Sequence, residues 1–155
     1  MNGGNNMKRG IRVIGMILLL AALLSMFAYA ENEASPYSST YLTRYEVSLE
    51  RSGTALEIWF DVTGRYVLPE IGTKTIVLQR SADGLRWTPT KVFSYTDYTN
   101  MLVHNQIQHI SHVTHTDVSW QYYRAYVAVY GGDGTNGDTR YVYTNTVQIP
   151  TNQNP

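Results

Sequence analysis

The chain has 155 residues, with twelve acidic and twelve basic side chains and no cysteine. The missing cysteines exclude disulfide bonds, thiol catalysis and metal sites with cysteine ligands. The balanced charge gives no broad positive field of the kind that attracts nucleic acid or anionic lipid, so we expect no nucleic-acid partner.

The N-terminal region has the order of a secretory signal peptide. An apolar run over residues 13–27 ends in Ala-Tyr-Ala at 28–30 and follows three basic residues, Lys8, Arg9 and Arg12. The run is shorter than the roughly 20 residues that a membrane-spanning helix needs. We therefore predict a hydrophobic signal helix within a signal peptide at 7–30, cleaved after Ala30, and a secreted or extracytoplasmic protein. The alternative is an uncleaved anchor, and this segment would then be the contact with a membrane.

The first six residues, MNGGNN, fit no part of a signal peptide. The codons of Gly3 and Gly4 can form a ribosome-binding sequence, with Asn5 and Asn6 as the spacer before a start codon at Met7. We interpret residues 1–6 as a misassigned start, and we expect a bacterial gene. Without residues 1–30, about 125 residues remain, which is the size of one ordinary domain.

Residues 31–40 are polar and predict a flexible leader, followed by a domain over 41–150. Apolar and polar residues then alternate over two segments, 45–49 and 56–62, which predicts two strands around a turn at Ser52-Gly53. Residues 73–93 repeat this arrangement, with Asp83-Gly84 as a hairpin turn. Two more strands flank the glycine-rich loop GGDGTNGD at 131–138, and residues 151–155 predict a disordered tail.

No segment after the signal carries an apolar stripe of helical period, and Val, Ile, Thr and Tyr dominate. Turn signals recur every ten to twenty residues. This pattern predicts an all-β domain, an antiparallel sandwich of two sheets with about seven strands. A small β-barrel buries the same alternating pattern and is the alternative.

The motif Y-x-A-x-V-x-V at residues 123–129, the glycine-rich loop after it and the strand ending at Ile149 resemble the last two strands of fibronectin type III and related immunoglobulin-like domains. The hairpin VLQRSADGLRW at 77–87 resembles the third-strand region of bacterial versions. The chain departs from the family in two respects, because no Leu-x-Pro-Gly precedes Tyr123 and Trp59 falls out of phase with its apolar neighbours. The resemblance implies a fold for residues 41–150 and no particular activity.

All four histidines lie in the segment HNQIQHISHVTHTD at 104–117. On a helix, the spacing of His109, His112 and His115 would suit a metal, but their β-branched neighbours predict a strand. On a strand, His109 and His115 share a face about 20 Å apart and His112 points the other way, so one metal cannot reach all three. We predict histidines that pack on a strand surface, with pH sensing as the alternative.

The loop at 131–138 offers oxygen ligands from Asp133, Asn136 and Asp138. Its GGDGTN resembles one repeat of the calcium-binding nonapeptide family, which binds calcium between stacked repeats, and this chain has one copy. A hairpin loop that needs glycines for positive φ explains the same residues. We therefore predict no resident metal or cofactor, and keep a calcium-dependent binder at this end of the domain as an alternative.

The strand that contains Tyr123 presents a polar and aromatic row on its opposite face, formed by Tyr122, Arg124, Tyr126, Ala128 and Tyr130. Tyrosine rings beside an arginine suit stacking on sugars or recognition of proteins, although tyrosine also stabilises strands without any ligand. We name Tyr122, Arg124, Tyr126 and Tyr130 as candidate binding residues. Trp87 and Trp120 would either extend this surface or close the ends of the sandwich.

The sequence contains no Gly-x-Ser-x-Gly, no His-Glu-x-x-His and no phosphate loop. Glu57 and Asp61 share a predicted strand face, but nothing marks them as acid and base, so we expect no enzyme. The predicted function is an exported binding or interaction module of the bacterial cell surface or extracellular space, with a glycan or surface protein as partner. The alternative is a structural or accessory envelope protein without a specialised ligand site.

Overall fold

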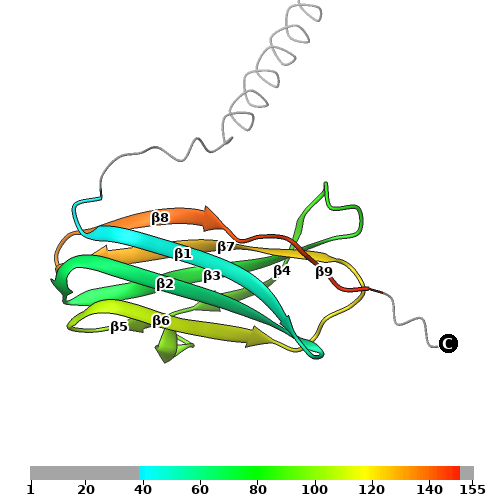
Figure 1. Cartoon of the computed structure of the whole chain (residues 1–155), viewed down its shortest axis with the longest axis horizontal. Helices are drawn as coiled ribbons and strands as arrows, with labels where there is room; N and C mark the ends of the chain where they lie inside the picture. The colour runs from blue at the N-terminus through cyan, green and yellow to red at the C-terminus, as the bar shows by residue number, and fades with distance from the viewer. Residues whose placement is uncertain (1–38, 151–155) are drawn as a thin grey trace, which may run out of the picture. The chain divides into compact units, whose positions relative to one another are not determined.

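The computed structural model of the chain describes residues 39–150 (Figure 1). The predicted signal peptide, residues 31–38 of the predicted leader and the predicted tail lie outside this range. The strands within it are β1 (Leu42–Ser52), β2 (Ala55–Leu68), β3 (Glu70–Ser81), β4 (Thr88–Ser94), β5 (Leu102–Val103), β6 (Gln106–His115), β7 (Tyr122–Gly132), β8 (Gly137–Tyr143) and β9 (Val147–Gln148), with one 3-10 helix, η1 (Thr99–Met101). Within this range, no helix has the length and apolar character that a membrane crossing requires.

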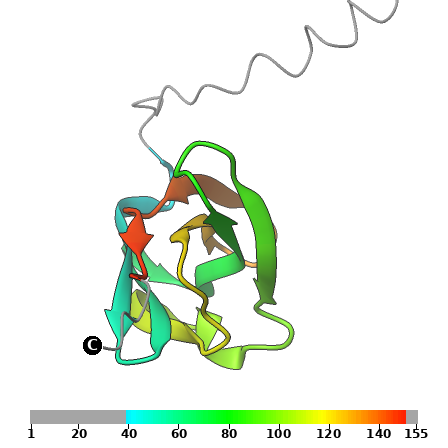
Figure 2. The same cartoon turned by 90° about the vertical axis from the view of Figure 1, so that its right-hand side faces the viewer.

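The strands form two antiparallel sheets. One has three strands in the order β1-β2-β6, and the other has six, in the order β4-β3-β7-β8 with β5 paired to β3 and β9 to β7. Figure 1 shows β1, β2 and β6 in front of the other sheet, and Figure 2 views the strands nearly end-on. The all-β prediction is confirmed for residues 39–150, and the alternative of a closed barrel is wrong. Seven of the nine strands are long, since β5 and β9 have two residues each.

The core lies between the sheets and follows the predicted alternation. On β2, Leu56, Ile58, Phe60 and Val62 are all buried, and β7 contributes every second residue from Tyr123 to Val129. Burial of these apolar side chains is the main favourable term in folding. Because side chains alternate along a strand, the same register turns the residues between them outward. Trp59, which is out of phase with the core residues of β2, is one of these outward residues.

A break between β8 and β9 lets one side chain join the two sheets. At the break, the backbone N–H of Thr144 donates to the carbonyl of Ala125, and the N–H of Ala125 donates to Oγ1 of Thr144, at 3.0 and 2.9 Å. Pairing with β7 therefore continues through the break. The next side chain, Asn145, turns to the other sheet, where its Oδ1 accepts from the N–H of Leu49 and its Nδ2 donates to the carbonyl of Leu49, both at 2.9 Å.

We expect Asn145→Ala to lower the free energy of unfolding by about 1–3 kcal/mol, because it leaves both backbone groups of Leu49 without these partners in a partly buried place. Chemical denaturation of the purified protein measures this loss. Asn145→Asp is the matched variant, since it keeps an acceptor for the N–H of Leu49 and removes the donor to its carbonyl. Unfolding of Asn145→Ala at the parent's denaturant concentration would show that the link between the sheets is dispensable.

Candidate functional site

The outer surface of the six-stranded sheet carries a cluster of aromatic rings. The register places Tyr143 opposite Tyr126 and Tyr141 opposite Ala128, so side chains of β7 and β8 share this surface. Trp87, just before β4, joins them through its contact with Arg124. We call this set the aromatic face, and its members are Trp87, Arg124, Tyr126, Tyr141 and Tyr143.

The aromatic face is a continuous stack. Tyr126 lies parallel to Tyr141, with centroids 5.5 Å apart and planes at 14°, and its ring is 4.6 Å from that of Tyr143. The Arg124 guanidinium lies 4.2 Å from the ring of Trp87 and 4.4 Å from that of Tyr143, and its Nε donates to Gln79 at 2.8 Å. Burial is the main cause that raises the pKa of the Tyr126 hydroxyl. Stacked rings and cation–π contacts of this kind hold side chains in fixed positions.

The structure separates the four predicted binding residues into two groups. Arg124 and Tyr126 lie within the stack. Tyr122 is half-buried and its ring lies beside Gly84 of the β3–β4 turn. Tyr130 is only 8% exposed, with the Lys74 ammonium 3.4 Å above its ring, so it forms part of the support and offers little surface to a partner.

Sequence reasoning missed Tyr141 and Tyr143, which are 59% and 42% exposed. The signal that points to them is their alternation on the strand after the glycine-rich loop, which pairs them with β7. Identifying them required the register of the hairpin as well as the row of side chains on β7. Both rings flank Tyr126, and they are the most exposed rings of the stack.

A hollow of about 340 Å³ lies beside Tyr141 on this surface. Its small residues are Thr75 and Ala128, which face each other in the register of β3 and β7. Because these side chains are shorter than the tyrosines and the lysine around them, they leave space at this point of the sheet. The complete lining is Lys74, Thr75, Val77, Tyr126, Ala128, Thr139 and Tyr141.

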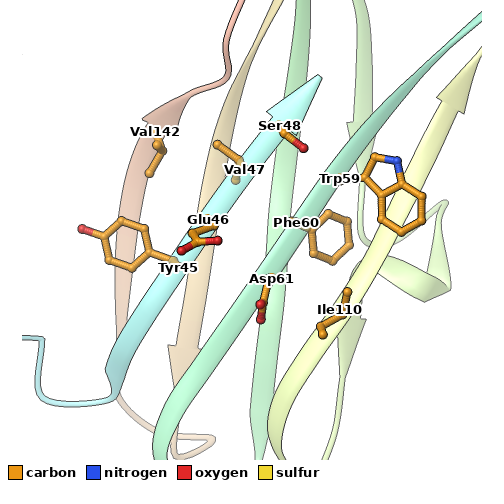
Figure 3. A pocket seen from close by; sticks show the side chains of 9 residues that line it. All are labelled: Tyr45, Glu46, Val47, Ser48, Trp59, Phe60, Asp61, Ile110 and Val142. Carbon is orange, nitrogen blue, oxygen red and sulfur yellow. The ribbon is translucent and has the colours of Figure 1, made fainter. Parts of the chain in front are cut away.

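A second hollow, of about 410 Å³, lies at the three-stranded sheet, and residues of β1, β2 and β6 form most of its lining (Figure 3). Figure 3 shows Trp59 and Ile110 on one side of it and Tyr45 and Val142 on the other. The Trp59 ring packs on His112, with centroids 4.3 Å apart. This contact explains why Trp59 is out of phase with the core.

The carboxylates Glu57 and Asp61 do share an outward face, as the sequence predicts, but each has its own partner. Glu57 accepts a hydrogen bond from Nε1 of Trp59 at 3.1 Å. Asp61 accepts from Nε2 of Gln108 at 2.8 Å and lies 3.5 Å from a nitrogen of Arg44. These contacts position side chains on the sheet, and they give no pair of carboxylates aimed at a common point.

The histidines lie on or beside strand β6, as predicted. The His109 ring packs 5.4 Å from that of Phe60, and its Nε2 is 2.7 Å from the carbonyl oxygen of Asn100. His104 lies before the strand, with Nδ1 3.0 Å from the carbonyl oxygen of Pro69. His112 faces the other way, on Trp59. Within residues 39–150, no three His, Asp or Glu side chains are grouped so that they could hold a metal ion.

The two aspartates of the glycine-rich loop form hydrogen bonds with the first described residues of the domain, 39–41. Asp133 accepts from the N–H groups of Thr135 and Asn136 and from the Tyr41 hydroxyl, at 2.7–2.9 Å. Asp138 accepts from the Ser39 hydroxyl and from the N–H of Thr40. Residues 39 and 40, which the sequence analysis assigned to the leader, are therefore part of the folded domain. The third predicted calcium ligand, Asn136, contributes its backbone to this turn.

The reason that this loop requires glycines differs from the predicted one, which was positive φ. Of the four, Gly134 alone has a positive φ, of 90°. A Cβ at Gly131 would lie 2.5 Å from the Leu42 side chain, and one at Gly137 would lie 2.4 Å from the Tyr130 hydroxyl. Close approach of neighbouring side chains, more than backbone conformation, requires glycine here.

No family model matches this chain. No curated protein matches it either. Among solved structures, the chain is similar to the solution structure of a protein described as a late embryogenesis abundant (LEA) protein, with 11% identity and a TM-score of 0.41, over 92% of this chain and 90% of that one. A likeness at this level carries no argument about function.

We expect acid to weaken the loop that Asp133 and Asp138 hold. The N–H of Asn136 is the main cause that lowers the pKa of Asp133, and the Ser39 hydroxyl is the main cause that lowers that of Asp138. A carboxylate whose pKa is lower in the folded state stabilises the fold above its unfolded pKa, near 3.9, and loses this contribution as the pH falls toward the folded value. The melting temperature should therefore fall below about pH 4.

Thermal melting between pH 6 and 2 measures this effect. The double variant Asp133→Asn, Asp138→Asn should start from a lower melting temperature and fall less steeply in acid. Asp117→Asn, on an exposed segment between β6 and β7, is the control and should follow the parent. Equal acid slopes for the double variant and the parent would contradict the role of the two loop carboxylates.

Calcium binding by the loop has its own test. Both carboxylates already accept hydrogen bonds, so calcium would have to replace several of them. We expect no change in melting temperature between calcium and chelator. A rise in calcium that Asp133→Asn abolishes would establish the alternative of a calcium-dependent binder, because a ligand that binds the folded state alone stabilises it.

Proposed function

We propose that the protein is an exported, non-catalytic binding module of the bacterial cell surface or extracellular space, and that it recognises its partner through the aromatic face. The observation that carries this proposal is the exposure of Tyr141 and Tyr143 on a stack that Tyr126 holds in place, beside a hollow. Rings that are fixed before binding lose little conformational entropy when a partner arrives. Export is supported by the basic, apolar and small-residue order of residues 7–30.

We also infer an immunoglobulin-like fold of the fibronectin type III kind. With the seven long strands lettered A to G, the sheets are A-B-E and D-C-F-G. Immunoglobulin constant domains have sheets A-B-E-D and C-F-G, so the fourth strand here pairs with the other sheet. The Tyr123 hydroxyl accepts from the N–H of Ser119 at 2.9 Å, at the start of strand F, where immunoglobulin-like folds have a tyrosine corner.

The partner that suits this surface best is a glycan. Flat, amphipathic rings stack on the apolar faces of sugars, and their hydroxyls remain hydrated at the rim. The threonines beside Tyr141, at positions 75 and 139, add hydroxyl groups that can donate and accept hydrogen bonds. A surface protein is the other partner class, and an accessory envelope protein without a ligand is the alternative function.

We expect Tyr141→Ala to weaken retention by an immobilised polysaccharide at least tenfold, since this ring is 59% exposed and its loss removes the stacking surface. Its effect on the free energy of unfolding should stay below about 1 kcal/mol, since the ring is exposed and its loss removes one stacked pair with Tyr126. Tyr66→Ala is the matched control, because Tyr66 is 47% exposed on β2 and lies outside the aromatic face. Affinity electrophoresis against a panel of polysaccharides, followed by thermal melting, makes both measurements.

Three results would count against the proposal. Parent-like retention of Tyr141→Ala would place the binding surface elsewhere on the domain. Equal losses in Tyr141→Ala and Tyr66→Ala would indicate a general effect of removing tyrosine. Absence of retention by every polysaccharide and by surface-protein extracts would favour the accessory envelope protein.

A further inference from the structure

The outer surfaces of the two sheets carry opposite charge. The outward positions of the three-stranded sheet hold four carboxylates and two guanidinium groups, those of Glu46, Glu50, Glu57, Asp61, Arg44 and Arg65. The outward positions of the six-stranded sheet hold two cations and one carboxylate, those of Lys74, Arg124 and Glu70. The formal charges are therefore −2 on the three-stranded sheet and +1 on the six-stranded sheet, so an anionic partner meets attraction at the aromatic face and repulsion on the opposite side.

Lys74 is the cation that lines the hollow. Its ammonium rests 3.4 Å above the Tyr130 ring, and it forms no ion pair with any residue of the described range 39–150. The carboxylate on the same surface, Glu70, lies near the Tyr130 hydroxyl, whose pKa is raised mainly by burial and then by this neighbouring charge. A fixed ammonium without a carboxylate partner at the side of a hollow is suited to bind an anionic group of a ligand.

The same hollow supplies the other contacts that a sugar ring needs. Tyr126 and Tyr141 provide aromatic surface, and Thr75 and Thr139 provide hydroxyl groups. Its volume, about 340 Å³, is at the lower end of the roughly 300–1,000 Å³ typical of small-molecule sites, which suits one or two sugar residues. An acidic peptide would use Lys74 in the same way, but it has no flat ring face to match the two tyrosines.

We propose that this hollow binds an acidic sugar residue of a polysaccharide, a hexuronic acid whose ring stacks on Tyr141 and whose carboxylate pairs with Lys74. This inference rests on the proposed function, since it names the ligand class of the same aromatic face. Lys74 determines the preference for charged over neutral sugar. Tyr141 contributes to the binding of both.

The test is isothermal titration of the purified protein, at 0.15 M salt, with polygalacturonate and with the same polymer fully methyl-esterified, which has no charge. Screening at this ionic strength suppresses long-range attraction and leaves the close contact. The parent should bind the acid at least tenfold more tightly than the ester. Lys74→Met should abolish this difference, and Tyr141→Ala should weaken binding of both polymers.

Lys91→Met is the matched control, because Lys91 lies on the neighbouring strand β4 opposite Leu78, away from the aromatic face. It should keep the preference for the acid. Equal losses in Lys74→Met and Lys91→Met would overturn the inference in favour of general charge attraction. Poly-L-glutamate that binds as tightly as polygalacturonate would also overturn it, since it offers carboxylates without sugar rings.

The two proposals fail in different ways. Equal binding of acid and ester, lost in Tyr141→Ala, would overturn the acidic ligand and leave the aromatic face as a glycan site. No binding of either polymer would overturn the acidic ligand, and the polysaccharide panel with Tyr141→Ala would then decide on the aromatic face. If a neutral polysaccharide is retained and this retention depends on Tyr141, the result would support the aromatic face as a glycan site and would not support the acidic ligand.

Discussion

The pairing of the Asn145 amide with both backbone groups of Leu49 is the constraint on which the arrangement of the two sheets depends. A sandwich needs its sheets aligned so that both inner faces bury the same core, and hydrophobic packing is not directional. Asn145 supplies direction at one edge, while Thr144 keeps the chain paired to β7. The same break ends β8, the strand of Tyr141 and Tyr143, and the pairing of β8 with β7 positions both rings on the aromatic face.

Side chains at the edges of both sheets limit how a partner can approach. Asn145 occupies the backbone groups of Leu49 on edge strand β1, and Nδ2 of Asn100 donates to the His112 carbonyl on edge strand β6 at 2.7 Å. Edge strand β4 contains Pro89, which has no N–H to offer. Unpaired backbone groups on an edge strand are the usual site at which another strand adds to a sheet. The two asparagines and the proline leave fewer such groups free. Recognition through the outer surface of a sheet is therefore consistent with the way the edges are built.

The sequence predicted what depends on neighbours in the chain and missed what depends on distant ones. Alternation identified the core of β2 and β7, and β-branched residues identified the histidine strand, because both signals are local. The role of Asn145 requires Leu49, 96 residues away, and that of Asp138 requires Ser39, 99 residues away, so no local pattern contains them. Tyr130 was placed on the correct face, but its burial depends on Lys74 and the glycines of the loop. The glycines were attributed to backbone conformation, although close packing requires most of them.

Tyrosine on a strand has a structural use, and this use explains why the aromatic face is suited to binding. Tyr126 gains stability from its two neighbouring rings and Arg124 from its two aromatic partners, so folding alone holds these side chains in position. The outermost ring, Tyr141, has one face against Tyr126 and remains 59% exposed. A ligand that stacks on Tyr141 extends a stack whose rings are already ordered. Its binding therefore immobilises few side chains and costs little conformational entropy. Because Lys74 is fixed over Tyr130 in the same manner, the charge and the rings of the hollow are both ordered by packing within the sheet.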